Sequence, residues 1–190
     1  MKTVNLMIVG VGGQGSLLAS KLLGALLLDE GYDVKVSEVH GMSQRGGSVV
    51  TYVRFGERVY SPLVDLGEAD FIVSFEKLEG ARYIDYLRPE GRVIVSTQQI
   101  DPMPVITGAA EYPADILEQY AAQGVKIDAF EALSLAERAG SVRAVNIVLM
   151  GRLARYLEIP YEKWINAIER IVPARFAAIN KEAFALGYNS

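Results

Sequence analysis

Two glycine-rich stretches hold the residue types that bind phosphates and other anions. In the first, an apolar run at 4–9 ends in the sequence GVGGQG, and an apolar stretch at 17–28 follows directly. A strand, a tight glycine turn and a helix in this order form the loop that binds dinucleotides, because free amides at the helix start face the anion. We therefore expect cofactor contacts from Gly10, Gly12, Gly13, Gln14 and Gly15. The alternative left open is a tight turn that packs well and binds nothing.

The second stretch, HGMSQRGG at 40–47, combines a hydroxyl, an amide, a guanidinium and two glycines. Exposed backbone amides beside an arginine can form a cradle for an anion. The candidate binding residues here are Ser43, Gln44, Arg45, Gly46 and Gly47. A flexible connection between two strands is the alternative.

Further polar residues follow predicted strands. Glu38 stands where a dinucleotide-binding domain holds an acid against the ribose hydroxyls, although a polar residue at a strand end explains it equally well. Ser74 and Glu76 lie at the carboxyl end of another predicted strand, at the edge where open sheets bind ligands. Glu76 is also explained as an acid at a helix N-terminus. Asn146, embedded in an apolar helix, is expected to cap a neighbouring backbone group or to touch a ligand.

The composition excludes several kinds of site. The 190 residues include no cysteine and one histidine, His40, so disulfides, cysteine nucleophiles and cysteine-ligated metal clusters are absent, and we predict no metal site. The net charge of −4 argues against general nucleic-acid binding. The apolar stretch at 17–28 is too short to span a bilayer, and the first residues lack a signal-peptide pattern, so we expect a cytoplasmic protein without membrane contact.

Strands alternate with helices along the chain, which predicts a doubly wound, Rossmann-like α/β fold with a mostly parallel sheet. We expect strands at 4–9, 34–39, 70–74, 92–96, 105–107 and 125–129, and helices at 16–30, 76–87, 113–123, 142–157, 161–171 and 175–186. Two runs at 48–55 and 58–60, separated by Gly56-Glu57, predict an inserted β-hairpin. We expect one domain over 1–190, with an α/β core at 1–140 and a helical segment at 141–190.

The predicted helix at 16–30 is apolar almost all round. A surface helix normally shows a single apolar stripe. This helix is therefore either sandwiched inside the domain or covered by another chain, and we favour partial burial at an interface.

Three segments together carry a family resemblance. The turn GVGGQG with its leucine-rich helix, the loop GMSQRGG leading into VVTYVRFG, and the later segment EADFIVSFEKLEGARY resemble the gamma-type domain of the 2-oxoacid:ferredoxin oxidoreductases. Within this family the chain is most similar to the small, or beta, subunits that act on indolepyruvate. The resemblance extends into the C-terminal helices, and the loop at 43–47 is its most specific part.

This resemblance implies the oxidative decarboxylation of a 2-oxo acid, here an aryl-pyruvate, with coenzyme A and ferredoxin. The family uses thiamine diphosphate and iron–sulfur clusters. With no cysteine and no GDG-type thiamine motif, this chain holds neither, so a larger partner subunit must supply both, and ferredoxin is reached only indirectly. The chain is then inactive alone and contributes no catalytic residue. The resemblance places coenzyme A at the glycine turn and the 43–47 loop, and leaves homodimerisation within the complex open.

Two other functions fit part of the sequence. A free-standing NAD(P)-dependent oxidoreductase is supported by GVGGQG and Glu38, but no Tyr-x-x-x-Lys arrangement accompanies them. A purely structural assembly module would leave the glycine turn empty. Nucleotide binding by the purified chain discriminates between these two, since a ligand that binds the native state must stabilise it.

Overall fold

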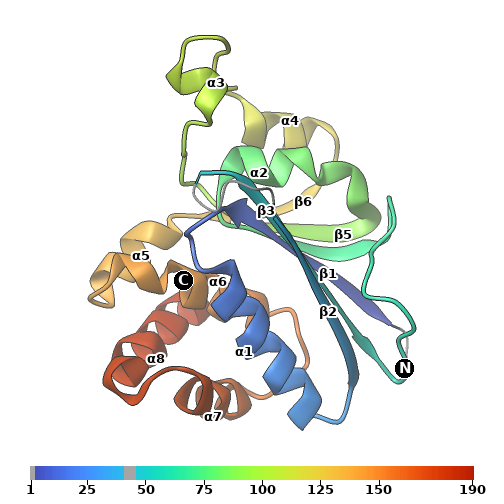
Figure 1. Ribbon diagram of the computed structural model, residues 1–190, viewed down its shortest axis with the longest axis vertical. Coiled ribbons are helices and arrows are strands. Elements are labelled where there is room, and N and C mark those ends of the chain that lie inside the picture. The colour runs from blue at the N-terminus through green and yellow to red at the C-terminus, as the bar shows by residue number, and fades with distance from the viewer. Residues whose placement is uncertain (1–2, 41–45) are drawn as a thin grey trace.

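The chain is built around a six-stranded sheet with the strand order β2-β3-β1-β4-β5-β6. The structure, a computed structural model, describes residues 3–40 and 46–190 (Figure 1). The strands are β1 (Val4–Val11), β2 (Asp33–His40), β3 (Ser48–Gly56), β4 (Ala69–Ser74), β5 (Leu87–Ser96) and β6 (Lys126–Phe130). The pairs β1–β4, β4–β5 and β5–β6 are parallel, whereas β3 is antiparallel to both β1 and β2. The predicted α/β fold class is confirmed.

Helices cover both faces of the sheet (Figure 1). One face carries α1 (Ser16–Asp29), α5 (Ala132–Arg138), the 3₁₀ turn η2 (Val142–Ala144), α6 (Val145–Ala154), α7 (Tyr161–Ile171) and α8 (Ala174–Asn189). The other face carries α2 (Lys77–Arg82), the 3₁₀ turn η1 (Ile84–Tyr86) and α4 (Ile116–Ala122). The short helix α3 (Met103–Ile106) projects away from the sheet. No helix in these described residues is both long and apolar enough to cross a bilayer.

The continuous apolar run of β1 follows from this layering. Leu6 and Ile8 pack into the cluster under α1, whereas Met7 and Val9 pack into the cluster on the α2 side. Because successive side chains of a strand point to opposite faces, a strand covered on both faces must be apolar at every position.

α1 is apolar almost all round because it lies between two layers. It contacts β2 and β3 on one side and α6 and α7 on the other. Leu22, Leu23 and Leu26 are buried there, whereas Leu17 and Leu28 remain exposed. Packing within the chain therefore accounts for the buried leucines of the helix, and the partial burial at an interface that we favoured stays a prediction.

The hairpin predicted across Gly56-Glu57 does not form. The antiparallel pair is β2 with β3, and Asp33 lies opposite Gly56. The predicted strand at 58–60 is irregular, because the Val59 amide donates its hydrogen bond to the Asp33 carboxylate, at 2.8 Å, instead of to a neighbouring strand. Antiparallel pairing does occur in the sheet, but β3 pairs with β2, which comes before it in the chain, and not with residues 58–60, which come after it.

Two further element predictions are wrong. The strand expected at 105–107 is the helix α3, whose first turn accommodates Pro102 and Pro104 because no intrahelical donor is needed there. The helix expected at 76–87 ends at Arg82, and β5 begins at Leu87. Pro89 lies where the pairing of β5 with β4 shifts register, a place where a strand tolerates proline.

Candidate functional site

The glycine turn between β1 and α1 lies at the carboxyl edge of the parallel strands, and two of its glycines are required by packing. A Cβ atom on Gly10 would lie 2.9 Å from Cβ of Phe75. A Cβ atom on Gly15 would lie 2.7 Å from Nδ2 of Asn146, and Gly15 has a φ of +88°. The side-chain amide of Asn146 donates a hydrogen bond to the Gly15 carbonyl at 3.1 Å. Asn146 therefore caps a neighbouring backbone group, which is one of its two expected roles.

Gln14 joins the turn to the ends of two neighbouring strands. Its Oε1 accepts a hydrogen bond from the Val11 amide at 2.8 Å. Its Nε2 donates to the Phe75 carbonyl at 3.1 Å and to Oε1 of Gln98 at 3.2 Å. Gln14 therefore holds the carboxyl ends of β1, β4 and β5 together.

The remaining part of the turn meets the second glycine stretch. The Gly12 amide donates to the Gly47 carbonyl at 2.8 Å. Among the described residues other than the chain neighbours, none lies within 4 Å of where a Cβ atom would stand on Gly13, which has a φ of +101°, or on Gly46. The structure thus brings Gly47 to the turn, with Gly46 directly before it. Ser43, Gln44 and Arg45 lie outside the described residues.

A buried carboxylate stands beside the turn at the carboxyl end of β4. Glu76 is 1% exposed and caps α2 by accepting the Glu79 amide at 2.9 Å. Its other oxygen accepts the Tyr112 hydroxyl and, at 3.3 Å, the Ile100 amide. Glu76 is therefore the acid at a helix N-terminus that one of the two sequence interpretations predicted. It also accepts hydrogen bonds from Ile100 and Tyr112, which lie further along the chain.

Two tyrosines near Glu76 are held in their neutral form. Burial raises the pKa of the Tyr112 phenol, and its hydrogen bond to the Glu76 carboxylate raises it further. Burial likewise raises the pKa of Tyr120, with a smaller contribution from the charge of Glu76. Both groups can donate a proton in a hydrogen bond at neutral pH, but neither is adapted to release one.

A second acid anchors the strand that follows the Ser43–Gly47 loop. Glu79 is 5% exposed and accepts hydrogen bonds from the Ser48 hydroxyl and, at 3.1 Å, from Nε of Arg82. Since Ser48 lies opposite Val11 in the sheet, this contact fixes the start of β3 beside the glycine turn.

Glu38 does not take the position of a ribose-binding acid. β3 separates β2 from β1, so Glu38 lies on the edge strand, two strands from the glycine turn. Its carboxylate accepts the Thr51 hydroxyl at 3.3 Å. In a dinucleotide-binding domain the acid ends the strand next to β1. The geometry therefore removes the main support for the NAD(P) alternative.

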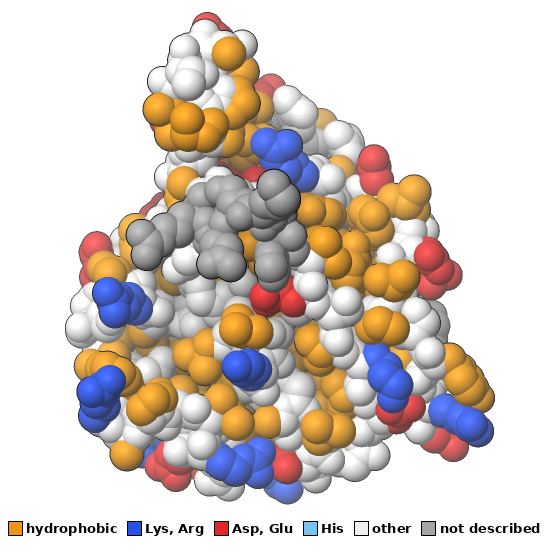
Figure 2. All heavy atoms as spheres, viewed as in Figure 1, with side chains coloured by type: hydrophobic (Ala, Val, Ile, Leu, Met, Phe, Trp, Pro, Cys, Tyr) orange, Lys and Arg blue, Asp and Glu red, His pale blue; other side chains and the backbone are white. Residues whose placement is uncertain are grey.

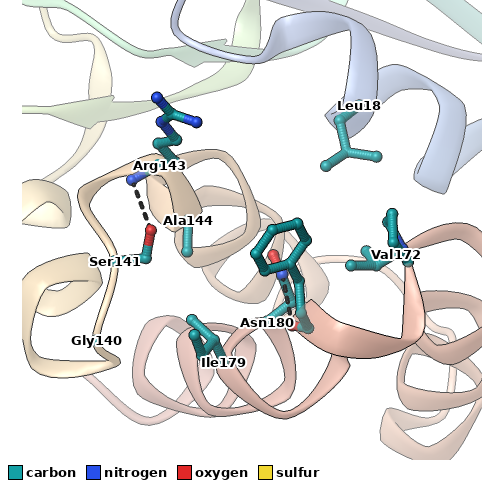
Figure 3. A pocket seen from close by; sticks show the side chains of 10 residues that line it. Leu18, Gly140, Ser141, Arg143, Ala144, Val172, Ile179 and Asn180 are labelled. Carbon is teal, nitrogen blue, oxygen red and sulfur yellow. Dashed lines mark hydrogen bonds between the residues drawn. The ribbon is translucent and has the colours of Figure 1, made fainter.

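A pocket of about 470 Å³ lies on the helical side of the turn (Figure 3). Leu18 enters it from the first turn of α1, and Val172 and Ile179 face it from the segment at α7 and α8 (Figure 3). Among the described residues that line it, Arg143 is the one that carries a charge. The volume is typical of ligand pockets.

Gln98 and Tyr112 are the site residues that the sequence prediction missed. Gln98 lies two residues after the end of β5, as Glu76 lies two residues after the end of β4, so the same rule applied to β5 would have found it. Nothing in the local sequence of Tyr112 points to its partner Glu76, which lies 36 residues earlier.

A family model described as pyruvate ferredoxin/flavodoxin oxidoreductase matches residues 5–190 of the chain. The chain belongs to this family. It is 46% identical to the indolepyruvate oxidoreductase subunit IorB of Thermococcus kodakarensis, over 98% of this chain and 95% of that protein. It is 36% identical to the subunit of the same name from Archaeoglobus fulgidus, over 98% and 94% of the two chains.

Two solved structures of oxidoreductase chains share the fold. Pyruvate oxidoreductase subunit PORC from Thermotoga maritima has a TM-score of 0.77 at 20% identity, covering all of this chain and 97% of that one. The 2-oxoglutarate:ferredoxin oxidoreductase from Magnetococcus marinus, solved with 2-oxoglutarate, coenzyme A and succinyl-CoA bound, has a TM-score of 0.70 at 18% identity. The structural similarity covers all of this chain and 31% of that longer chain.

Membership of the family confirms the expected class of protein. The chain is a small subunit of a 2-oxoacid:ferredoxin oxidoreductase and works as part of a heteromeric complex with larger subunits. The family as a whole depends on thiamine and iron–sulfur chemistry.

Proposed function

We propose that this chain is the small subunit of an aryl-pyruvate:ferredoxin oxidoreductase, with indolepyruvate as the substrate of its complex. The observation that carries this proposal is the 46% identity to an indolepyruvate oxidoreductase subunit over 98% of this chain. In this reaction a 2-oxo acid loses carbon dioxide, its acyl group is transferred to coenzyme A, and two electrons pass to ferredoxin. The larger subunit carries the thiamine diphosphate and the electron path.

The residues of this chain do not fit an iron–sulfur cluster, because such clusters are held by cysteine thiolates and the chain has none. Its contribution is therefore to bind and to position. Polar side chains at the carboxyl edge, including Gln14, Glu76 and Gln98, form hydrogen bonds with other residues of this chain. They therefore suit a rigid surface for ligand and subunit contacts.

The test is co-expression with the candidate larger subunit and an assay of dye reduction that depends on both a 2-oxo acid and coenzyme A. We expect activity only when both chains are present, with indolepyruvate preferred over pyruvate. Assembly with a clear preference for a small aliphatic 2-oxo acid would refute the substrate proposal. A lone chain that binds NAD(P) and forms no complex would refute the proposed function.

We further propose that coenzyme A binds at the glycine turn (Gly10, Gly12, Gly13, Gln14, Gly15) together with the loop Ser43–Gly47. Three features support this site. No described residue other than its chain neighbours lies within 4 Å of a Cβ atom on Gly13, α1 begins directly after the N-cap Gly15, and Arg45 stands two residues before Gly47, whose carbonyl accepts the Gly12 amide. Phosphate groups of coenzyme A match such a cradle.

Arg45→Ala in the assembled complex should weaken coenzyme A binding by roughly tenfold or more, because a charge-assisted hydrogen bond is worth about 1.5–3 kcal/mol. The matched control is Arg175→Ala on α8, which removes an exposed arginine that is not part of the proposed site. Titration of the complex with coenzyme A measures both. An unchanged affinity in the Arg45 variant would argue against the site.

A further inference from the structure

An exposed arm leaves the carboxyl edge of the sheet and returns to it. We define the arm as residues 101–111, which lie between β5 and α4 and carry α3 at their tip. None of these residues is buried. Figure 1 shows α3 standing clear of the sheet and of the other helices, and Figure 2 shows hydrophobic side chains gathered on this projection.

Both ends of the arm are fixed to one buried group. The Ile100 amide, just before the arm, and the Tyr112 hydroxyl, just after it, donate to the same oxygen of Glu76. The Tyr112 hydroxyl also accepts the Leu78 amide at 3.2 Å, and Lys77 lies 5.4 Å from the centre of the Tyr112 ring. The arm is thus a projection with a rigid base.

The arm also has internal structure. The Thr107 hydroxyl donates to the Met103 carbonyl at 2.9 Å, and the Ala109 amide donates to the Pro104 carbonyl at 2.8 Å. Two prolines, Pro102 and Pro104, restrict the backbone further. An element that is ordered before binding loses less conformational entropy when it docks.

The tip of the arm is apolar, and the segment of chain that carries the arm is acidic. Met103 and Ile106 are 63% and 65% exposed. The segment 93–125, which contains the arm, has no Lys, Arg or His. Its acids are Asp101, Glu111, Asp115 and Glu118, all of them exposed. A partner surface that matches this arm must combine an apolar recess with basic residues around it.

We propose that the arm docks this chain on the larger subunit of its oxidoreductase, with Met103 and Ile106 in an apolar recess whose rim is basic. The inference rests on the proposed function, which supplies the larger subunit. The same fold forms 31% of a longer chain in the Magnetococcus marinus oxidoreductase, so its surface there meets the rest of an oxidoreductase. Gln98, three residues before the arm, is bonded to Gln14 of the glycine turn. Docking the arm therefore brings the larger subunit against the turn.

The test compares two exposed side chains in the co-expressed complex. Ile106→Lys should weaken the binding of the larger subunit at least tenfold, because it puts a charge into the apolar recess. The matched control is Leu66→Lys, at a side chain that is 67% exposed and lies outside the arm. The control should bind within twofold of the unaltered chain. Unchanged melting temperatures of the isolated variants would show that both fold.

Charge provides a second readout. Glu111→Lys should slow association with the larger subunit, and more so at low salt, whereas Glu137→Lys on α5 should not. Tight binding by the Ile106 variant, or equal loss in the Leu66 control, would overturn the proposal. Loss of self-association instead of loss of the heteromeric complex would assign the arm to a second copy and overturn it too. If the unaltered chain forms no complex at all, the proposed function itself fails.

Discussion

The glycines of the β1–α1 turn differ in what they do. Gly10 and Gly15 leave room for Phe75 and Asn146, whereas a Cβ atom on Gly13 would have no described residue other than its chain neighbours within 4 Å. The sequence could predict the turn, because the glycine spacing and the flanking elements are local. It could not predict that Asn146, 131 residues later, occupies the space beside Gly15, since this contact depends on how α6 packs on α1.

This difference predicts unequal effects of two alanine substitutions. Gly13→Ala should lower the free energy of unfolding by about 1–2 kcal/mol, the cost of a left-handed conformation alone. Gly15→Ala should cost about 1–3 kcal/mol more, because its Cβ would also displace the Asn146 amide from the Gly15 carbonyl. Denaturant unfolding of the two variants measures the difference. Equal losses would mean that the Asn146 contact does not constrain the turn.

At the scale of elements, local patterns predicted most helices and strands but not their neighbours. α1 and α7 begin and end close to the predicted residues, because glycines flank α1 and prolines flank α7 in the sequence. The strand run at 48–55 was also predicted, but nothing in it reveals that β3 lies between β1 and β2. Because β3 separates β2 from β1, Glu38 lies away from the glycine turn, and the predicted ribose-binding role of Glu38 is wrong.

The base of the arm gives a prediction at this scale. Tyr112→Phe should leave the Glu76 carboxylate short of one hydrogen bond and speed proteolytic cleavage within the arm by roughly 5- to 30-fold, for a loss of about 1–2 kcal/mol. Tyr60→Phe, at an 81% exposed tyrosine, is the control and should change nothing. Limited digestion with subtilisin, normalised to an unfolded peptide, measures the rates.

The same bond predicts a pH dependence. Because the pKa of Tyr112 is raised in the folded chain, its stabilising effect is complete below the pKa of an unfolded tyrosine, about 10, and is lost as the pH rises further. The difference in cleavage rate between the unaltered chain and Tyr112→Phe should therefore shrink above about pH 10. A difference that stays constant to pH 11 would contradict the role given to the phenol.

At the scale of the whole molecule, the helices after β6 belong to the same apolar cluster as the sheet. Trp164 and Phe184 from α7 and α8 share this cluster with Leu23 of α1 and Ile8 of β1. We propose on this basis that residues 1–190 form a single cooperative domain, in which the helical segment at 141–190 does not unfold separately from the α/β core.

Gly187→Ala tests this cooperativity. Its Cβ atom would lie 2.0 Å from the carbonyl oxygen of Val148, so α8 must move away from α6, at a cost of about 1–3 kcal/mol. Trp164, the only tryptophan, stacks on Phe184 of α8 and reports on the helical segment, whereas far-UV circular dichroism reports on the whole chain. In a single domain, the midpoint denaturant concentrations of the two unfolding transitions should fall by the same amount. A shift confined to the tryptophan signal would divide the chain into two units, because the sheet would then keep its stability without the helices that cover it.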